Sequence, residues 1–524
     1  MLLVRLLAFL DAACGVRVAG GERAVHAGYV CALLAALQVA LERKARERHT
    51  DLGKYAMATV ERLVTMVAGG GHGDPEGALA AAAGAGGAGS ADGPAPVSTE
   101  VVVLRQTGNA ISLLAAHLPR ARHGELADQV CLRLGVHGAA HGAAHDAAPS
   151  GPLRAASPQA VLNLLAPLAA ALAPLLAADH MPCGAALLPT LLDWLLDRTP
   201  CTGESEALQS QSAYLLLFTA LNKYTEAAKL APGGAAAAPL EAFWHRIVQG
   251  GMPHQRRVQA VQAWVWAARA QLARGDARGT AMLDALRTQL FGDAQLATAA
   301  AHALRILVGP DGVLTRQNGF QVRLLYKQRV LSELLPRLVE QFRASAGVDA
   351  RVRDTCLIAL AALLPSMPEP TLCEQVRELV PLLVHMLGVD DAAARASAAH
   401  ALLVAMTAAV NARGVTDDGA PAPRTEADDQ LSALLAEHLA QLVQRLVDNV
   451  VPGPSQPLRT RIAALRALGA LVALLEHDQL LPQRRAVVQA LGRAGQGIDD
   501  PRREVRLHAV DTRDLWYRVN AATE

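Results

Sequence analysis

Three stretches of the sequence share one pattern: GVDARVR at 347–353, GVDDAAAR at 388–395 and GIDDPRREVR at 497–506. Each runs from a glycine through an apolar residue to one or two aspartates, and then to an arginine. Upstream stands a Leu-Pro or Val-Pro step, at 335–336, 380–381 and 481–482, with a further example at 188–189. Proline is tolerated in the first turn of a helix, because its missing N–H would have no partner there. Each copy therefore predicts a helix that opens at the proline, a short loop and a second helix.

The arginines of these second helices set the period of the repeat, at positions Arg353, Arg395, Arg461 and Arg506. They are 42, 66 and 45 residues apart. The long interval contains a loop-like segment at 413–424, and removing about 20 residues there restores a period in the low to mid forties, as in HEAT and armadillo helix pairs. We predict an all-α fold, a right-handed superhelical solenoid of such pairs.

Aspartate has a physical role at the start of the second helices. Its carboxylate can accept hydrogen bonds from the first N–H groups of a helix and is favoured at the positive end of the helix dipole. We therefore expect Asp349, Asp390 and Asp499 to cap their helices. We also expect the arginines one turn later to reach an aspartate of a neighbouring repeat.

The composition of the 524 residues agrees with this prediction. Hydrophobic residues make up 52% and aromatic residues only 3%, which supplies a large helical core but few of the residues that β-sheets favour. The formal net charge of +1 argues against a dedicated nucleic-acid-binding protein. Seven cysteines without CxxC spacing indicate free thiols in a reducing compartment.

Low-complexity segments divide the chain into four parts. We predict helical repeats over 1–68, a flexible Gly/Ala/Pro-rich insertion over 69–100, HEAT-like repeats over 101–308 with a loop at 137–152, and C-terminal HEAT repeats over 309–524 with a loop at 412–428. The uncharged stretch 155–178 is long enough to suggest a membrane span, but three prolines interrupt it. We expect no membrane association.

Only one residue cluster suggests metal chemistry. His137, His141 and His145 lie four residues apart, the spacing of metal ligands on one helix face. The surrounding sequence is a degenerate tetrapeptide with a glycine in each unit, which favours a low-complexity loop. A metal-dependent enzyme therefore remains the alternative, while our main prediction assigns no catalytic residue, no cofactor and no resident metal.

Arginine is concentrated near the C-terminus, with eleven arginines between 459 and 518 and the aromatic pair Trp516-Tyr517 close to the end. Such a stripe fits nucleic acid, an acidic protein surface, or solvated faces with pairs between repeats. The candidate partner-binding residues are Arg484, Arg485, Arg502, Arg503, Arg513 and Trp516.

The order of several motifs resembles a known family. These are LNKY at 221–224, YKQR at 326–329, RIAAL at 461–465, DDPRREVR at 499–506 and RDLW at 513–516. They are similar to the C-terminal repeats of the methyl-methanesulfonate-sensitivity family of HEAT proteins. The sequence departs from that family in its Gly/Ala insertions at 69–97 and 137–152, and in lacking a counterpart of the N-terminal half.

The resemblance implies a non-catalytic scaffold of the cytosolic iron–sulfur protein assembly machinery. Members of the family join a small cluster-assembly factor and a WD-repeat propeller protein to apoproteins that receive 4Fe–4S clusters, among them DNA replication and repair enzymes. It further implies location in the cytoplasm and nucleus and no direct contact with nucleic acid. The alternative within the same fold is another HEAT adaptor, such as a transport receptor or a tubulin-folding cofactor.

Overall fold

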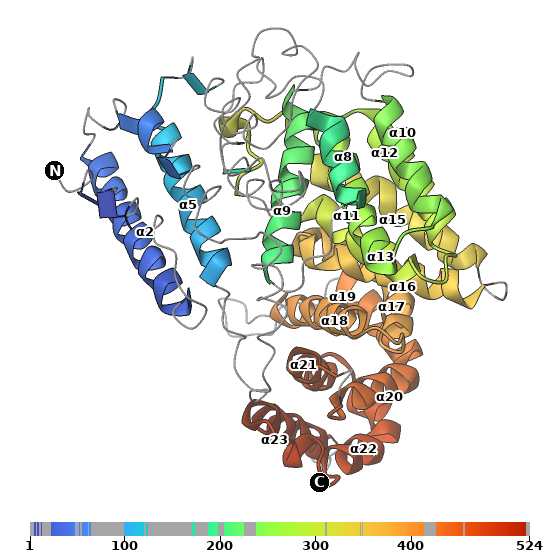
Figure 1. The fold of residues 1–524 in the computed structure, drawn as a ribbon. Helices are drawn as coiled ribbons and strands as arrows, with labels where there is room; N and C mark the ends of the chain where they lie inside the picture. The colour runs from blue at the N-terminus through green and yellow to red at the C-terminus, as the bar shows by residue number, and fades with distance from the viewer. Residues whose placement is uncertain are drawn as a thin grey trace. The chain divides into compact units, whose positions relative to one another are not determined.

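The computed structural model contains helices joined by loops (Figure 1). It describes residues 23–47, 99–119, 187–197, 204–224, 237–309, 312–345, 349–412, 426–453 and 456–519, and positions 5, 6, 8, 9, 12, 52, 55–60, 62, 63, 122, 123, 170, 171, 173 and 347. Within these residues there is no β-strand, and the one isolated bridge pairs Gly453 with Gln456.

The chain forms two compact units that interleave in sequence. Unit 1 contains Met1–Asp284 and Asp311–Tyr326, and unit 2 contains Ala285–Pro310 and Lys327–Glu524. The boundary at 308/309 expected from composition falls inside this interleaved region. Each unit is described separately below.

Unit 2 is built from successive helix pairs. Its elements are the end of α12 (Ala277–Leu290), α13 (Ala297–Ala303), α14 (Arg305–Val308), α15 (Tyr326–Ala344), α16 (Ala350–Leu363), α17 (Glu369–Met386), α18 (Ala392–Ala412), α19 (Glu426–Glu437), α20 (Leu439–Val450), α21 (Leu458–Leu474), α22 (His477–Leu491) and α23 (Arg503–Arg518), with short 3-10 turns at Leu364–Ser366 and Gly497–Asp499.

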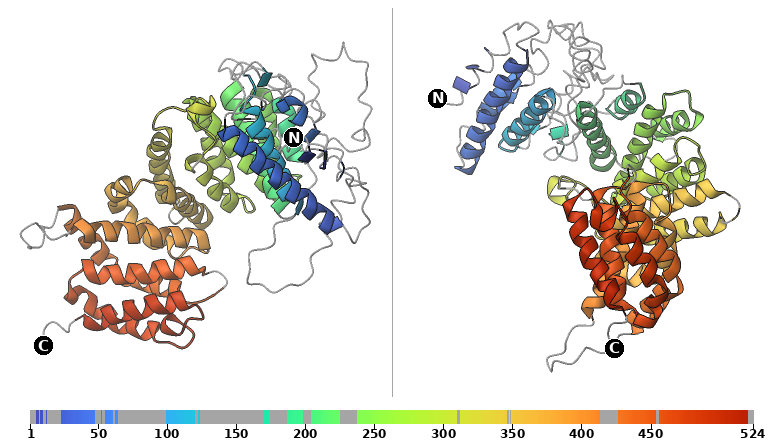
Figure 2. Two further views of the ribbon diagram at one scale, coloured as in Figure 1. Left: turned by 90° about the vertical axis from the view of Figure 1, so that its left-hand side faces the viewer. Right: turned by 90° about the horizontal axis from the view of Figure 1, so that it is seen from below.

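The second helices of the pairs pack in one row, in the order α13, α16, α18, α21 and α23. The first helices form the other row, in which α17 contacts α20 and α20 contacts α22. Figure 1 shows the two rows side by side in the orange and red part of the chain, and Figure 2 shows their helices stacked one above another. Each pair thus contacts its neighbours in sequence, and the prediction of an all-α solenoid of helix pairs is confirmed.

The arginine period corresponds to a fixed place in the repeat. Arg353, Arg395, Arg461 and Arg506 are each the fourth residue of a second helix, in α16, α18, α21 and α23 respectively. The sequence spacing therefore located the repeats correctly. The long interval contains the additional helix α19 as well as residues of the expected 412–428 loop, of which 413–425 lie outside the described residues.

The expected role of the prolines is wrong in three of four repeats. Pro336, Pro381 and Pro482 lie inside α15, α17 and α22, and only Pro189 lies in a first turn, that of α8 (Leu187–Asp197). A proline inside a helix removes one hydrogen bond and costs about 3 kcal/mol. In α15 this cost is offset because buried leucines lie on both sides of Pro336, including Leu335 and Leu338.

The expected aspartate caps are right at α16, one residue out at α18 and absent at α23. Asp349 Oδ1 accepts hydrogen bonds from the N–H groups of Arg351 and Val352, as predicted. In α18 the cap is Asp391, whose Oδ1 accepts from Ala394 N at 2.7 Å, whereas the Asp390 side chain is fully exposed. Near α23 the structural carboxylate is Asp500, whose Oδ1 accepts from Arg502 N, while Asp499 accepts from Gly495 N within the loop. At α18 only the second of the two adjacent aspartates caps the helix, whereas α23 begins after Arg502 and neither aspartate caps it.

One helix, α18, is long and apolar enough over Ala392–Asn411 to cross a membrane by composition alone. It carries the buried Arg395 and packs against α16, α17 and α21 in the middle of unit 2. Its hydrophobicity is therefore accounted for by its place in the core.

Unit 1 contains α2 (Arg23–Arg46), α5 (Thr99–Ala115), α8, α9 (Glu204–Thr219), the π-helical turn η6 (Ala220–Tyr224), α10 (Ala237–Gln249), α11 (His254–Arg274), most of α12 and the turn η8 (Arg316–Asn318). α11 contacts α8, α9 and η6. Its two tryptophans anchor the core: Trp264 stacks on Trp244 with ring centroids 4.5 Å apart, and Trp266 meets Phe218 edge-on.

Two expected segments lie outside the described residues. These are the insertion expected at 69–100, of which 69–98 lie outside and 99–100 instead begin α5, and the loop at 137–152, which contains His137, His141 and His145. The metal-dependent alternative is therefore not tested at its own residues. In the part of the chain that the structure does describe, no group of three or more His, Cys, Asp or Glu side chains is placed to hold a metal ion.

Candidate protein-binding surface

The last described helix pair, α22 and α23, positions the arginine-rich segment. α23 packs against α21 and α22 through a stripe of Val505, Ala509, Thr512 and Trp516. Thr512 Oγ1 donates to Leu465 O at 3.1 Å, and Trp516 Nε1 donates to Leu468 O at 3.0 Å. Both acceptors lie in α21, so side-chain hydrogen bonds as well as apolar contacts fix the orientation of α23.

The expectation that Trp516 contacts a partner is wrong in this fold. Its side chain is completely buried and its only polar atom is bonded to α21. The reason is its spacing: Val505, Ala509, Thr512 and Trp516 follow each other at intervals of four, three and four, which places them on one helix face. Trp516 anchors the surface and takes no part in it.

The opposite side of α23 is exposed. Leu507 and Val510 are 57% and 54% exposed, and the carboxylates Glu504, Asp511 and Asp514 surround them. Asp514 is paired with Arg518 at 2.6 Å. Among the described residues α23 ends its row, so no further helix of the row covers this face.

Two of the expected arginines form a cluster around Tyr517. Arg484 of α22 donates from Nη2 to Tyr517 O at 2.8 Å, and Arg513 donates from Nη2 to the Tyr517 hydroxyl at 3.0 Å. The Arg513 guanidinium also lies over the tyrosine ring, 5.0 Å from its centroid. Tyr517 is 45% exposed, so this cluster joins α22 to α23 and presents an aromatic ring at the surface.

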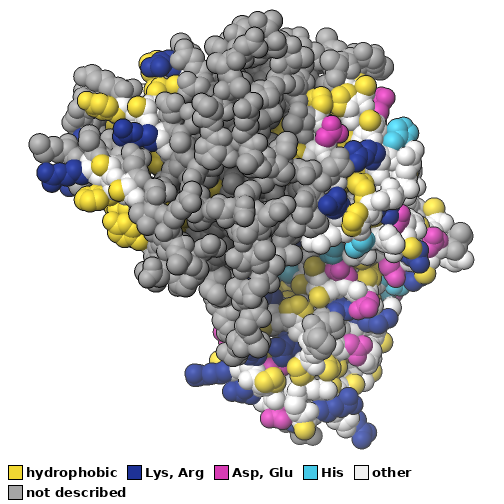
Figure 3. Space-filling view, in the orientation of Figure 1, with side chains coloured by type: hydrophobic (Ala, Val, Ile, Leu, Met, Phe, Trp, Pro, Cys, Tyr) yellow, Lys and Arg dark blue, Asp and Glu magenta, His cyan; other side chains and the backbone are white. Residues whose placement is uncertain are grey.

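The other expected arginines, Arg485, Arg502 and Arg503, are exposed. Arg485 lies on α22, and Arg502 and Arg503 lie at the start of α23. Figure 3 shows basic side chains among apolar ones on the end of the molecule that these helices form. The structure therefore places five of the six expected residues on the surface of one helix pair, where they can meet a partner's carboxylates.

Buried polar contacts connect the pairs beneath this surface. Arg461 donates from Nη1 to Asp500 Oδ2, joining α21 to the loop before α23, and the two side chains are 8% and 0% exposed. This confirms that an arginine reaches a neighbouring repeat's aspartate. The other three do not: Arg353 lies 3.7 Å from Asp354, Arg395 donates to Val389 O, and Arg506 donates to Asp500 O, each partner belonging to the arginine's own repeat.

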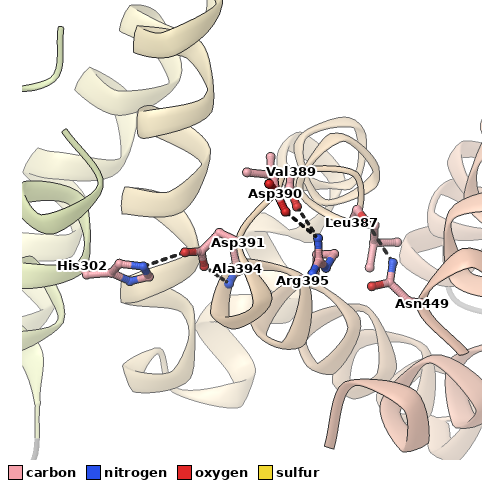
Figure 4. A network of polar contacts seen from close by, with 8 residues as sticks. All are labelled: His302, Leu387, Val389, Asp390, Asp391, Ala394, Arg395 and Asn449. Atoms are coloured by element: carbon pink, nitrogen blue, oxygen red, sulfur yellow. Dashed lines mark hydrogen bonds and ion pairs between the residues drawn. The ribbon is translucent and has the colours of Figure 1, made fainter. Parts of the chain in front are cut away.

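A second network lies farther from the C-terminus (Figure 4). His302 Nε2 of α13 lies 2.8 Å from Asp391 Oδ2, and Asn449 Nδ2 of α20 donates to Leu387 O at the end of α17. Burial acts to raise the pKa of Asp391, but the hydrogen bonds from His302 and from the Ala394 N–H outweigh it and lower that pKa. Asp391 thus caps α18 and holds α13 with one ionised carboxylate.

Cys356 is unsuited to nucleophilic chemistry. Cys356 is fully buried in α16, and burial raises the pKa of its thiol to about 12. A thiol with such a pKa is almost entirely protonated at neutral pH, whereas the thiolate is the reactive form. Cys356 therefore acts as a small apolar core residue.

Sequence reasoning missed some polar residues of structural importance. Arg257 is the fourth residue of α11, as in the later repeats, is buried, and donates to Ile247 O at 3.2 Å. Its position after Pro253 could have revealed it. Asn222 and Lys223 in η6 are also buried, and nothing in the repeat pattern marks them.

Comparison with known proteins identifies the family. Residues 1–472 match the sequence family of the MMS19 C-terminal region, which is described as "RNAPII transcription regulator C-terminal". The chain belongs to the MMS19 family. Within that family it is 24% identical over 279 residues to the DNA repair/transcription protein mms19 of Schizosaccharomyces pombe, which covers 52% of this chain and 24% of the relative.

The human relative, named MMS19 nucleotide excision repair protein homolog, is 28% identical over 266 residues, covering 51% of this chain and 23% of the relative. The matched region is thus about a quarter of each MMS19 relative. Among solved structures, the karyopherin Kap121p bound to the SUMO protease Ulp1p covers 99% of this chain and 49% of its own, at 11% identity and a TM-score of 0.39. The match to the MMS19 family ends at residue 472, within α21. The arginine surface of α22 and α23 therefore lies beyond the matched residues.

Proposed function

We propose that this chain is a non-catalytic scaffold of the cytosolic iron–sulfur protein assembly machinery and that α22 and α23 dock an assembly partner. Membership of the MMS19 family supports the first part. The observation that carries the second is the exposed arginine and aromatic surface on the last described helix pair. Arginine and aromatic side chains are the residues that contribute most to protein interfaces.

The geometry suits a rigid docking surface. Trp516 and Thr512 fix α23 to α21, and Arg484 and Arg513 hold Tyr517 from two helices. A partner that binds here meets side chains that are already ordered, so less conformational entropy is lost on binding. Arg485 and Arg503 remain exposed for contact with carboxylates.

The partners follow from the family resemblance. We propose the small cluster-assembly factor and the WD-repeat propeller protein as constant partners, and apoproteins that receive 4Fe–4S clusters as clients. The cluster is cargo, bound by assembly factors and clients. Clients in DNA replication and repair agree with the names of the MMS19 relatives, which refer to DNA repair and transcription. They require the scaffold in both cytoplasm and nucleus.

Charge reversal tests the docking surface. Arg485→Glu with Arg503→Glu should weaken binding of the small assembly factor by about tenfold or more, measured by titration calorimetry at physiological salt. The melting temperature should stay nearly unchanged because both side chains are exposed. Arg484 is left intact, since its hydrogen bond to Tyr517 O is structural.

The matched control is Arg343→Glu with Arg351→Glu, which makes the same charge change at two exposed arginines of unit 2 outside α22 and α23. The control should bind like the parent chain. Equal weakening in both variants would show a general effect of net charge. Unchanged affinity in the Arg485/Arg503 variant would place the partner surface elsewhere.

A further inference from the structure

A strained turn in unit 1 carries two exposed leucines. Tyr326 N donates to Arg323 O at 3.4 Å, which closes a four-residue turn over Arg323–Tyr326. Its third residue, Leu325, has a φ of 59° and is the one non-glycine residue with positive φ in the part of the chain that the structure describes. Glycine or asparagine is favoured at such a position, because a larger side chain crowds the backbone there.

Packing does not compensate for this strain. Leu324 is 78% exposed and Leu325 is 66% exposed, the two highest values among the exposed large hydrophobic side chains described. An exposed leucine by itself is ordinary. Two adjacent ones on a turn whose backbone disfavours leucine indicate a role outside the folded chain, since strained residues persist mainly at functional sites.

The turn is held firmly from beneath. Asn222 accepts from Gln321 N at 2.9 Å and donates to Gln321 O at 3.0 Å, while Arg323 N donates to Ala273 O at 2.8 Å. Phe320 is buried against Phe218 and lies under Lys223 Nζ. The leucines therefore project from an ordered base, as an interface anchor does.

The charged side chains of the segment that carries the leucines are all basic. Arg316 and Arg323 are exposed beside them, and the sequence contains no Asp or Glu from Gly312 to Ser332. Arg316 Nε is bonded to Val322 O, which holds one of these cations close to the turn. A binding surface for this turn must be apolar at its centre and acidic around it.

We infer that Leu324 and Leu325 form an anchor for a second protein whose surface carries an apolar pocket surrounded by Asp and Glu. This goes beyond the proposed docking on α22 and α23 and does not depend on it, because the turn belongs to unit 1. An anionic membrane fits less well, because two leucine side chains give little insertion energy.

The first test uses stability. Leu325→Asn places a residue that tolerates positive φ in the turn and removes the apolar side chain. If Leu325 serves binding, this variant should melt about 1–3 °C higher than the parent chain. If Leu325 serves the fold, the variant should melt lower, and that result would overturn the inference.

The second test identifies the partner chemically. Leu324→p-benzoylphenylalanine in the full chain allows photo-cross-linking in cells, and the cross-linked segment of the partner is mapped by mass spectrometry. We expect a segment that combines apolar residues with Asp or Glu. Its purified domain should bind the parent chain and lose about tenfold affinity with Leu324→Ser or Leu325→Asn. Arg323→Glu should weaken binding further, and added salt should weaken it in the parent chain.

Val39→Asn is the matched control, since Val39 is 62% exposed on α2, and it should bind like the parent chain. Vesicles of phosphatidylcholine with about 30 mol % phosphatidylserine provide the lipid arm. Leucine-dependent binding to these vesicles, a cross-link to a second copy of this chain, a mapped segment without acidic residues, or no cross-linked protein would each overturn the inference.

Discussion

The two units differ in part of their buried polar contacts, although Arg257 of unit 1 occupies the same helix position as the buried arginines of unit 2. In unit 2 the buried arginines Arg395 and Arg461 occupy the same position in successive second helices, and their partners lie in the same repeat or the next. In unit 1, Asn222 and Lys223 bond to residues 48 to 99 positions away in sequence. Periodic contacts can be extended along a solenoid by adding repeats, whereas the contacts of Asn222 and Lys223 hold one particular loop in one particular place.

The difference has a consequence for function. Unit 2 can present a regular row of helices that ends in an exposed arginine surface. Unit 1 uses its buried amide and ammonium groups to fix the segment 312–325, which carries the strained leucine turn. We therefore expect substitutions in the two units to differ in size, in pH dependence and in their effect on binding.

The largest effect should come from the buried ion pair of unit 2. Arg461→Ala leaves the fully buried Asp500 carboxylate without its guanidinium and should cost about 3–5 kcal/mol of unfolding free energy. Urea denaturation measures it. Replacing both residues, as Arg461→Met with Asp500→Leu, should recover most of the loss. A single substitution that costs less than about 1 kcal/mol would show that the pair does not hold α21 to α23.

Two buried asparagines allow a matched comparison of the units. Asn222→Ala removes hydrogen bonds to Ala270 O, Gln321 O and Gln321 N, and should cost about 2–4 kcal/mol. Asn449→Ala removes bonds to Leu387 O and to Arg445 O, one turn away in the same helix, and should cost about 1–2 kcal/mol. Chemical denaturation of both variants shows which substitution lowers the unfolding free energy more. Equal costs would show that the three hydrogen bonds of Asn222 stabilise the fold no more than the two of Asn449.

The stability of the two units should change in different pH ranges. Burial lowers the pKa of Lys223 from 10.5 to about 8, so the unfolded chain binds the extra proton between these values and stability rises with pH there. The gain should be about 1–3 kcal/mol from pH 8 to 10.5 and absent in Lys223→Met. The pKa of Asp391 in unit 2 is lowered, so its contribution is present above pH 4 and lost in acid. If stability rises between pH 8 and 10.5 as much in Lys223→Met as in the parent chain, the effect does not come from Lys223.

The smallest effect distinguishes two adjacent aspartates. Asp391→Ala removes the cap of α18 and the bond to His302, and should cost about 0.5–2 kcal/mol. Asp390→Ala changes a fully exposed side chain 3.9 Å from Arg395 and should cost less than about 0.5 kcal/mol. Thermal melts compare the two. A larger loss of stability for Asp390→Ala than for Asp391→Ala would show that Asp390 caps the helix, as expected from the sequence.

The sequence predicted those features that repeat. The arginine spacing placed all four second helices, because a periodic solenoid puts the same residue at the same point of each unit. It could not choose between Asp390 and Asp391, since both precede a helix and only the backbone geometry decides which one caps it. The start of α15 was predicted wrongly at Pro336, because buried leucines on both sides of this proline stabilise a helix that continues through it.

The candidate surface was predicted in part. The arginines of α22 and α23 were found from composition, but Trp516 was assigned to the surface although its spacing from Val505, Ala509 and Thr512 places it on the buried face. The contacts of Asn222 and Lys223 were beyond prediction, because residues up to 99 positions apart meet only once the chain has folded. The positive φ of Leu325 likewise has no signal in the sequence.

The proposed function requires that this chain bind its assembly partners without performing chemistry of its own. Its most direct test is light scattering on size-exclusion chromatography of the full chain mixed with the purified assembly factor and WD-repeat propeller. The account predicts a stoichiometric complex of all three that forms without metal, cluster or nucleotide, and that loses the assembly factor when Arg485→Glu and Arg503→Glu are introduced. Separate elution of this chain at micromolar concentrations of its partners would contradict the account.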